Sequence, residues 1–327
     1  MRPAILLLCV FLSVTANPRA EAQASQSPIF RFEADGFWLN LHHFLYVLGR
    51  VEAGMSDIKR RAVAGAPADQ DAGLRSLTDA ERNVWREAVT AYAKTVSLKD
   101  AVFDVEVYGV TNSLVGLKAT DGLDRATGLN PAVRVVLEKA GPIYRKAWWP
   151  QHQKSNDARV AELQQLVEQY GDQVLRYVTR AYQEPWPVGG YPVNMSAYTN
   201  WAGAYSTRGN LLMFSSTDPG NTGAWGLEIA FHEGMHQWDD AIFEKLRTAA
   251  RQNSIARIPG GLTHAMIFFT AGEAVRSVLP AHVPYAEREG MWTNAPFSTF
   301  KPRLDAWWKP YLDGKGTLSD ALSGLIK

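Results

Sequence analysis

The sequence IAFHEGMHQW, residues 229–238, lies in a proline-free stretch, 225–250, that predicts a helix. His232 and His236 are four residues apart, so on a helix they stand one turn above each other and both imidazoles can reach the same ion. Glu233 lies to one side of this pair, where its carboxylate can act as a base. The motif therefore predicts a zinc site with a base beside it. The alternative is a helix whose two histidines are merely packed or exposed.

A catalytic zinc ion needs a third protein ligand and one open position. Glu273 interrupts the apolar stretch 262–279, for which we expect a second helix. Because an ionised glutamate is rarely buried without a cation or a metal ion, we expect Glu273 to be the third ligand. The alternative is a salt bridge to Arg276, three residues further on, and the two interpretations are compatible.

The residues just after the motif restrict the type of site. In metzincins a third histidine follows the motif, but the corresponding positions here are Asp239 and Ile242, which excludes that family. Asp240 lies on the same helix face as the histidines, yet eight residues of helix rise about 12 Å, so it cannot share an ion with His232. We expect Asp240 to accept a hydrogen bond from His236 instead.

The sequence leaves the group that would stabilise an oxyanion open. His264, Tyr205 and Tyr285 are candidates by residue type, but no spacing rule selects one of them. His264 is nine residues before Glu273 and falls on the opposite side of a straight helix. We therefore expect His264 in the core or at the surface.

With these residues, the chain resembles the gluzincins, the zinc metallopeptidases of thermolysin and aminopeptidase type. In that group a His-Glu-x-x-His helix is followed by a second helix with a glutamate ligand. The resemblance covers about residues 210–280, and the Gly-x-Met-Glu-Asn segment of aminopeptidases is absent from the sequence. It implies zinc ligands at His232, His236 and Glu273 and a general base at Glu233.

The function that we expect is that of an exported zinc-dependent metallopeptidase. It would hold one zinc ion and hydrolyse peptide bonds in a peptide or protein substrate, with a zinc-bound water activated by Glu233. In similar enzymes a strand before the motif helix binds the substrate backbone, and residues 210–214 occupy that place.

Two alternatives stay open. One is a noncatalytic, metal-containing exported protein that binds a glycan or a peptide, in which four protein ligands would close the metal site. The other is a zinc amidase that acts on a non-peptide amide. The sequence indicates neither substrate preference nor oligomeric state.

The fold class that we predict is α+β and mostly helical. Two extended segments, 191–198 and 210–216, form a small sheet that is followed by the zinc-binding helix and the second ligand-bearing helix. The predicted division is a signal peptide over 1–24, a helical region over 25–188 and a catalytic region over 189–327.

The first residues predict export. Arg2 precedes an apolar stretch, 4–14, and small residues follow up to Ala24, a pattern typical of a signal peptide that is cleaved near Ala24. The apolar stretch is too short for a membrane span, so we expect a secreted or periplasmic protein without a stable membrane anchor. The formal net charge of +1 argues against nucleic acid as a partner.

The helical region has local start signals. Thr78 and Glu81 form a capping box that predicts a helix over 79–96, and Asn130 before Pro131 predicts another that ends near residue 149. We also expect a helix over about 30–61, a loop over 62–76, a strand over 102–108 and one long helix over 157–183. His42 and His43 lie in the first of these helices, and we expect them to be packed rather than metal-binding.

Overall fold

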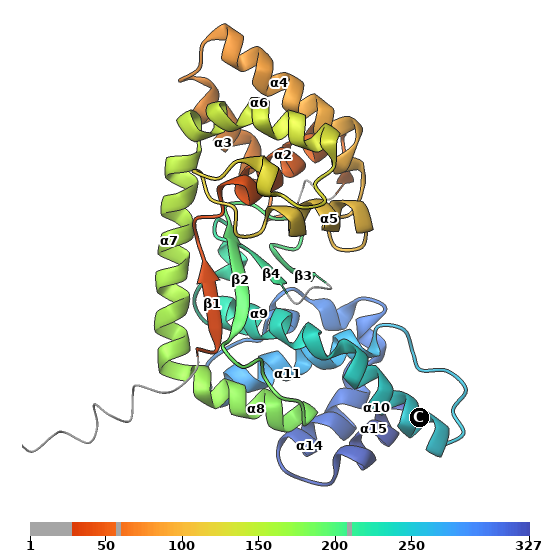
Figure 1. Cartoon of the computed structure of the whole chain (residues 1–327). Coiled ribbons are helices and arrows are strands. Elements are labelled where there is room, and N and C mark those ends of the chain that lie inside the picture. The colour runs from red at the N-terminus through yellow and green to blue at the C-terminus, as the bar shows by residue number, and fades with distance from the viewer. Residues whose placement is uncertain (1–27, 57–59, 208–210) are drawn as a thin grey trace, which may run out of the picture.

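The structure, a computed structural model, describes residues 28–56, 60–207 and 211–327. It is mostly helical with one small mixed sheet, in agreement with the predicted α+β class (Figure 1). The predicted signal peptide, residues 1–24, lies outside the described residues.

The sheet has four strands in the order β1-β2-β4-β3. β1, β2 and β4 run parallel, and β3 is an antiparallel strand at one edge. The bounds are β1 Phe30–Glu33, β2 Tyr191–Ser196, β3 Ala204–Thr207 and β4 Leu211–Ser215. The sequence predicted β2 and β4 but missed β1 and β3.

Both faces of the sheet are covered by helices, so alternate strand residues enter two different cores. Val193, Leu212 and Phe214 belong to the cluster formed with the C-terminal helices, whereas Tyr205 and Met213 belong to the cluster formed with the N-terminal helices. Because both of its faces are buried, the inner strand β4, LLMFS, is nearly continuously apolar, whereas the edge strand β1, FRFE, alternates between apolar and charged residues.

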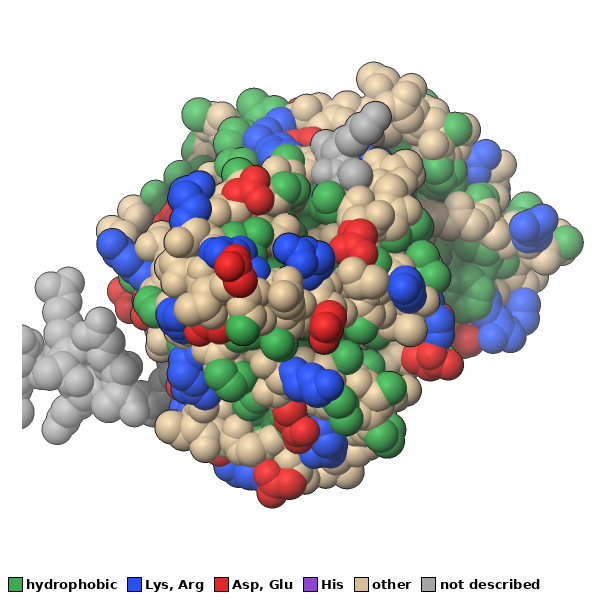
Figure 2. Space-filling view, turned by 90° about the horizontal axis from the view of Figure 1, so that it is seen from above, with side chains coloured by type: hydrophobic (Ala, Val, Ile, Leu, Met, Phe, Trp, Pro, Cys, Tyr) green, Lys and Arg blue, Asp and Glu red, His purple; other side chains and the backbone are tan. Residues whose placement is uncertain are grey.

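The N-terminal helical layer is built around α2, which is buried along almost its whole length and packs against α4. Lysine and arginine alternate with aspartate and glutamate over the face of the molecule seen from this side, without a patch of one sign (Figure 2). The helices of this layer are α2 Phe37–Glu52, α3 Ala66–Leu74, α4 Asp79–Lys94, α5 Val105–Leu114 and α6 Pro131–Ala147.

The helix α7 connects the two layers and runs alongside β1 (Figure 1). It begins at Trp149, earlier than predicted, and a π-helical turn, Val167–Gly171, separates it from α8. The C-terminal layer contains α8 Asp172–Tyr182, α9 Gly223–Met235, α10 Asp239–Gln252, α11 Leu262–Val278, α12 Tyr285–Arg288, α14 Lys309–Leu312 and α15 Leu318–Ile326. In the described ranges, no helix is long and apolar enough to cross a bilayer.

The local start signals are confirmed. The Thr78 hydroxyl accepts from the amide of Glu81, and the Glu81 carboxylate accepts from the amide of Thr78. Asn130 accepts from the amide of Ala132 at the start of α6. These helices begin where the sequence places them because each cap satisfies amides that the first helical turn leaves unpaired.

Three predictions about the N-terminal region were wrong. Residues 30–33 form a strand because they pair with β2, and residues 105–108 begin α5 because Asp104 caps its first turn. The predicted loop 62–76 contains α3, where Gly73 lies so close to Trp148 that a Cβ would come within 2.2 Å of the indole. Long-range contacts determine the structure of residues 30–33 and of α3, whereas the start of α5 had a local sequence signal in Asp104.

His42 and His43 are fully buried in α2 and packed, as expected. His42 contacts the Tyr92 hydroxyl at 3.1 Å through Nδ1 and Thr111 Oγ1 at 3.4 Å through Nε2. Nε2 of His43 lies 2.8 Å from the Tyr205 hydroxyl. Burial lowers the pKa of His42 to about 3. Burial also lowers the pKa of His43 well below its usual value, and the neighbouring His42 lowers it further. Both imidazoles are therefore neutral in the folded protein at pH 7.

We predict that the protein loses stability as the pH falls below about 6.5, because unfolded histidines bind protons that folded His42 and His43 do not. Each such proton changes the free energy of unfolding by about 1.4 kcal/mol per pH unit. Urea unfolding between pH 4 and 6 gives the slope of the free energy of unfolding against pH. This slope should be smaller in His42→Asn than in the wild type by the amount that corresponds to one proton, and the asparagine amide can still contact Tyr92. An unchanged slope in this variant would contradict the neutral buried state of His42.

Candidate metal centre

The motif residues occupy the last turn of α9 and the turn that follows it. α9 ends at Met235, and residues His236–Trp238 form a 3-10 turn before α10 begins at Asp239. The predicted single helix over 225–250 is therefore interrupted within the motif. His232 is buried, whereas His236, whose side chain is 21% exposed, and His264 are both partly exposed, so the site opens toward solvent on the side of these two rings.

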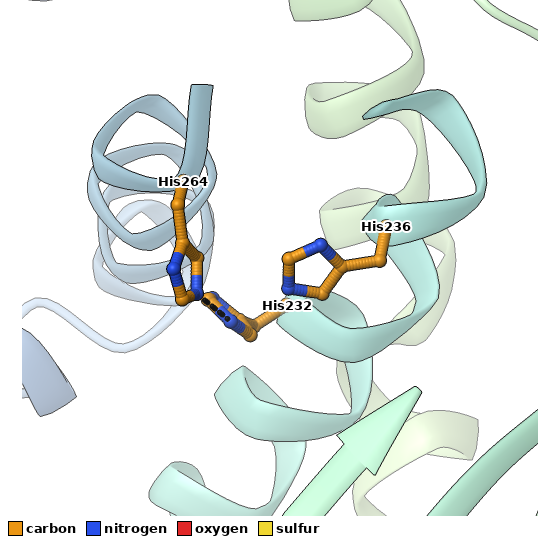
Figure 3. Close-up of side chains that lie close together, drawn as sticks. All are labelled: His232, His236 and His264. Carbon is orange, nitrogen blue, oxygen red and sulfur yellow. Dashed lines mark hydrogen bonds between the residues drawn. The ribbon is translucent and has the colours of Figure 1, made fainter. Parts of the chain in front are cut away.

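Three histidines converge at this turn. His232 and His236 from α9 and the following turn meet His264 from α11, and one ring nitrogen of each lies within 4.8 Å of the others (Figure 3). Nε2 of His232 and Nε2 of His264 are 3.3 Å apart. Ligand nitrogens around a tetrahedral zinc ion lie about 3.3 Å from one another when each bond is about 2.0 Å. The three imidazoles are therefore close enough to bind one metal ion.

The surroundings favour neutral imidazoles at two of the three positions. Burial lowers the pKa of His232 well below its usual value, and the neighbouring His236 and His264 lower it further. Burial and His236 lower the pKa of His264 to about 4. A neutral imidazole has the free electron pair that a metal ligand needs, so these two rings are ready to coordinate at neutral pH.

His236 is oriented by Asp239. Its Nδ1 lies 2.9 Å from Asp239 Oδ2, which leaves Nε2 for the cluster. Burial opposes protonation of His236, but the hydrogen bond to Asp239 and the charges of Glu233 and Asp239 outweigh it and raise its pKa. The prediction that Asp240 has this role was wrong, since Asp240 is exposed and begins the next helix with Asp239. The 3-10 turn moves the acceptor one residue earlier.

Glu233, the residue after His232, is buried, with 7% of its surface exposed, and its carboxyl interacts electrostatically with His236. Burial raises the pKa of its carboxyl, while His236 and Ser206 act in the opposite direction. The Ser206 hydroxyl, from β3, donates a 2.7 Å hydrogen bond to the backbone carbonyl of Glu233. The backbone of the sequence-predicted base is therefore held by the edge strand, and its carboxyl is close enough to His236 to affect the pKa of that ring.

The structure does not bring Glu273 to the histidines. Its carboxylate forms ion pairs with Arg276 at 2.9 Å and with Lys309 at 3.4 Å, and it is not part of the cluster of potential ligands. His264 occupies the place expected for Glu273. Nine residues along α11 correspond to a rise of about 13.5 Å and half a turn, so only one of these two residues can face α9. The salt bridge to Arg276, the alternative interpretation of Glu273, is present.

Aromatic side chains cover the histidine cluster. The ring of Phe268 lies 3.9 Å from that of His232 and 4.7 Å from that of His264, measured between centroids. Phe297 and Tyr285 pack on Phe268 in turn. This apolar cover reduces the hydration of the cluster, which strengthens electrostatic interactions within it.

A buried pair between Glu228 of α9 and His282, which follows α11, holds the segment that supplies Tyr285 to this cover. Glu228, one turn before His232, lies 2.6 Å from Nε2 of His282 and accepts hydrogen bonds from the amide of Tyr285. Burial raises the pKa of Glu228, against the opposing effect of His282 and the Tyr285 amide. This pair could not be predicted from the sequence because its two residues are 54 positions apart in the chain.

The first variable position of the motif, Gly234, faces Trp186. A Cβ at this position would lie 2.4 Å from the indole ring, which in turn packs against Phe231 and Trp238. The back of the motif turn is therefore filled by an aromatic side chain that leaves no space for any residue larger than glycine.

Comparisons of the chain with protein families, curated proteins and solved structures found no match. The resemblance to gluzincins therefore rests on the motif itself. The position of Glu273 departs from the ligand set of that group, and His264 supplies a third nitrogen in its place.

We predict that His264→Ala weakens zinc binding by more than about 100-fold, because it removes one of three ligands. Glu273→Gln is the matched control on the same helix and should leave the zinc affinity unchanged. Competition with a chromophoric chelator measures both variants. If Glu273→Gln lost zinc binding and His264→Ala retained it, the third zinc ligand would be Glu273 rather than His264.

We predict that Asp239→Ala weakens zinc binding by about 10- to 100-fold, the effect of removing a hydrogen-bond partner that orients a ligand. Asp240→Ala, one residue further along the same helix, should bind zinc like the wild type. The same chelator competition distinguishes them, and equal effects of the two substitutions would show that charge alone is responsible.

Proposed function

We propose that the protein is an exported zinc-dependent metallopeptidase that hydrolyses peptide bonds. The observation that carries this proposal is the convergence of His232, His236 and His264, with the buried Glu233 following His232 in the chain and close enough to raise the pKa of His236. Three nitrogen ligands match the number of protein ligands in a catalytic zinc site, which keeps one position for water or substrate. In the described part of the chain the cluster has three members, whereas a purely structural zinc site has four ligands.

The residues fit a divalent zinc ion because imidazole nitrogen is one of its preferred ligands and two of the rings are held neutral. A bound zinc ion would supply Lewis-acid chemistry, polarising a carbonyl oxygen and making water more acidic. Glu233 would accept the proton of the attacking water and later deliver it to the leaving amine. Its raised pKa suits this exchange because a base works best when its pKa is near the working pH.

The substrate would be held in extended form at the edge of the sheet. The sequence predicted this role for residues 210–214, but β4 pairs with β2 on one side and with β3 on the other, so its backbone is already hydrogen-bonded. β3 is the edge strand on this side and contacts α9. Strand addition at β3 would place a peptide bond beside the cluster.

Glu233→Gln tests the proposed base. The variant should retain its fold and zinc content but cleave a diverse peptide library about 100- to 10,000-fold more slowly than the wild type, because it lacks a proton acceptor. Intact-mass analysis of cleavage products, combined with metal analysis of the same samples, gives both quantities. Wild-type activity in the metal-loaded variant would reject Glu233 as the base. A metal-loaded wild type that cleaves no peptide but hydrolyses other amides would favour the amidase alternative.

A further inference from the structure

The edge strand β3 lies between the two helical layers and contacts both. Tyr205 projects into the N-terminal core cluster, whereas the neighbouring Ser206 bonds to Glu233 on the opposite face. β3 has only four residues, and Tyr205 is paired with Met213 of β4. A strand this short has little hydrophobic pattern with which to fix its register.

On the N-terminal side, β3 is held by a buried polar contact. The Tyr205 hydroxyl lies 2.8 Å from His43 Nε2 and 3.4 Å from Thr111 Oγ1. His43 is fully buried, and its Nδ1 has no hydrogen-bond partner within the described ranges. An unpaired ring nitrogen in a core lowers stability, so packing alone does not explain a histidine here. Buried polar residues can instead favour one packing arrangement of neighbouring elements over another, because only that arrangement satisfies their hydrogen bonds.

On the C-terminal side, β3 contacts the end of α9, where the α-helix is followed by the 3-10 turn His236–Trp238. The backbone carbonyl of Glu233 accepts the amide of His236, a contact of the 3-10 turn, and also the hydroxyl of Ser206. The position of β3 therefore affects the turn that carries the base and the second histidine.

We infer that His43 and Tyr205 are positioning residues that fix the register of β3 and thereby the position of Glu233. Side chains alternate between faces along a strand, so a shift by one residue would turn Ser206 toward α2 and Tyr205 toward α9. Such a shift would remove the hydrogen bond to Glu233. The N-terminal helical layer thus affects the catalytic site through β3, although none of the residues of this layer lies in that site. This inference rests on the proposed function, because it assigns a consequence for catalysis.

Tyr205→Phe tests the inference, and Tyr92→Phe is its matched control. Each substitution removes one buried hydroxyl that contacts a histidine of α2, but the Tyr92 hydroxyl contacts His42 and does not touch β3. We expect Tyr205→Phe to lower kcat for peptide cleavage at least tenfold, because small displacements of a catalytic group are costly. KM should change less than kcat, and Tyr92→Phe should keep wild-type kcat. Ser206→Ala, which removes the link to Glu233, should reproduce the loss in kcat.

Hydrogen exchange gives a readout that does not depend on activity. The amides of residues 204–207 and 211–215 should exchange at least tenfold faster in Tyr205→Phe than in Tyr92→Phe. Equal changes in kcat and in exchange for the two tyrosine variants would overturn the inference, as would wild-type behaviour of Tyr205→Phe. If the wild type cleaves no peptide, the proposed function fails, and the exchange experiment still decides whether Tyr205 fixes β3.

Discussion

The packing of α9 against α11 is the constraint on which the candidate metal centre depends. Both helices are buried along most of their length, so a polar side chain between them finds few partners other than one on the facing helix. His232 and His264 meet in this way, and His236 joins them from the turn that ends α9. The facing ring nitrogens of His232 and His264, 3.3 Å apart, can share a hydrogen bond or can both point at one ion. The packing of the two helices thus brings three ring nitrogens close enough to bind a metal ion.

The turn that ends α9 determines the geometry of the candidate metal centre as much as the helix itself does. A continuous helix would place Asp240 below His236, but the tighter turn brings Asp239 to Nδ1 and leaves Nε2 free for the cluster. The same turn exposes the carbonyl of Glu233 to Ser206 of β3. Glu233, His236 and the edge strand are therefore linked through one short segment of backbone, which connects the sheet to the candidate metal centre.

Features governed by neighbouring residues could be predicted from the sequence. The caps at Thr78 and Asn130 and the pairing of His232 with His236 follow from helix geometry. The choice between His264 and Glu273 could not be predicted, because α11 is apolar on nearly every side and its sequence does not indicate which side faces α9. β1 and β3 were missed because each is only four residues long and depends on partners that are remote in the chain.

The contact between Gly234 and Trp186 has a consequence for how sequences of this type can vary. The two positions are sterically coupled, so a larger residue in the motif would have to be accompanied by a smaller one in place of the indole. Compensated pairs, rather than single exchanges, are the expected route by which such a turn diversifies. A glycine within the motif together with an upstream tryptophan is thus a joint signature by which proteins built in the same way can be sought.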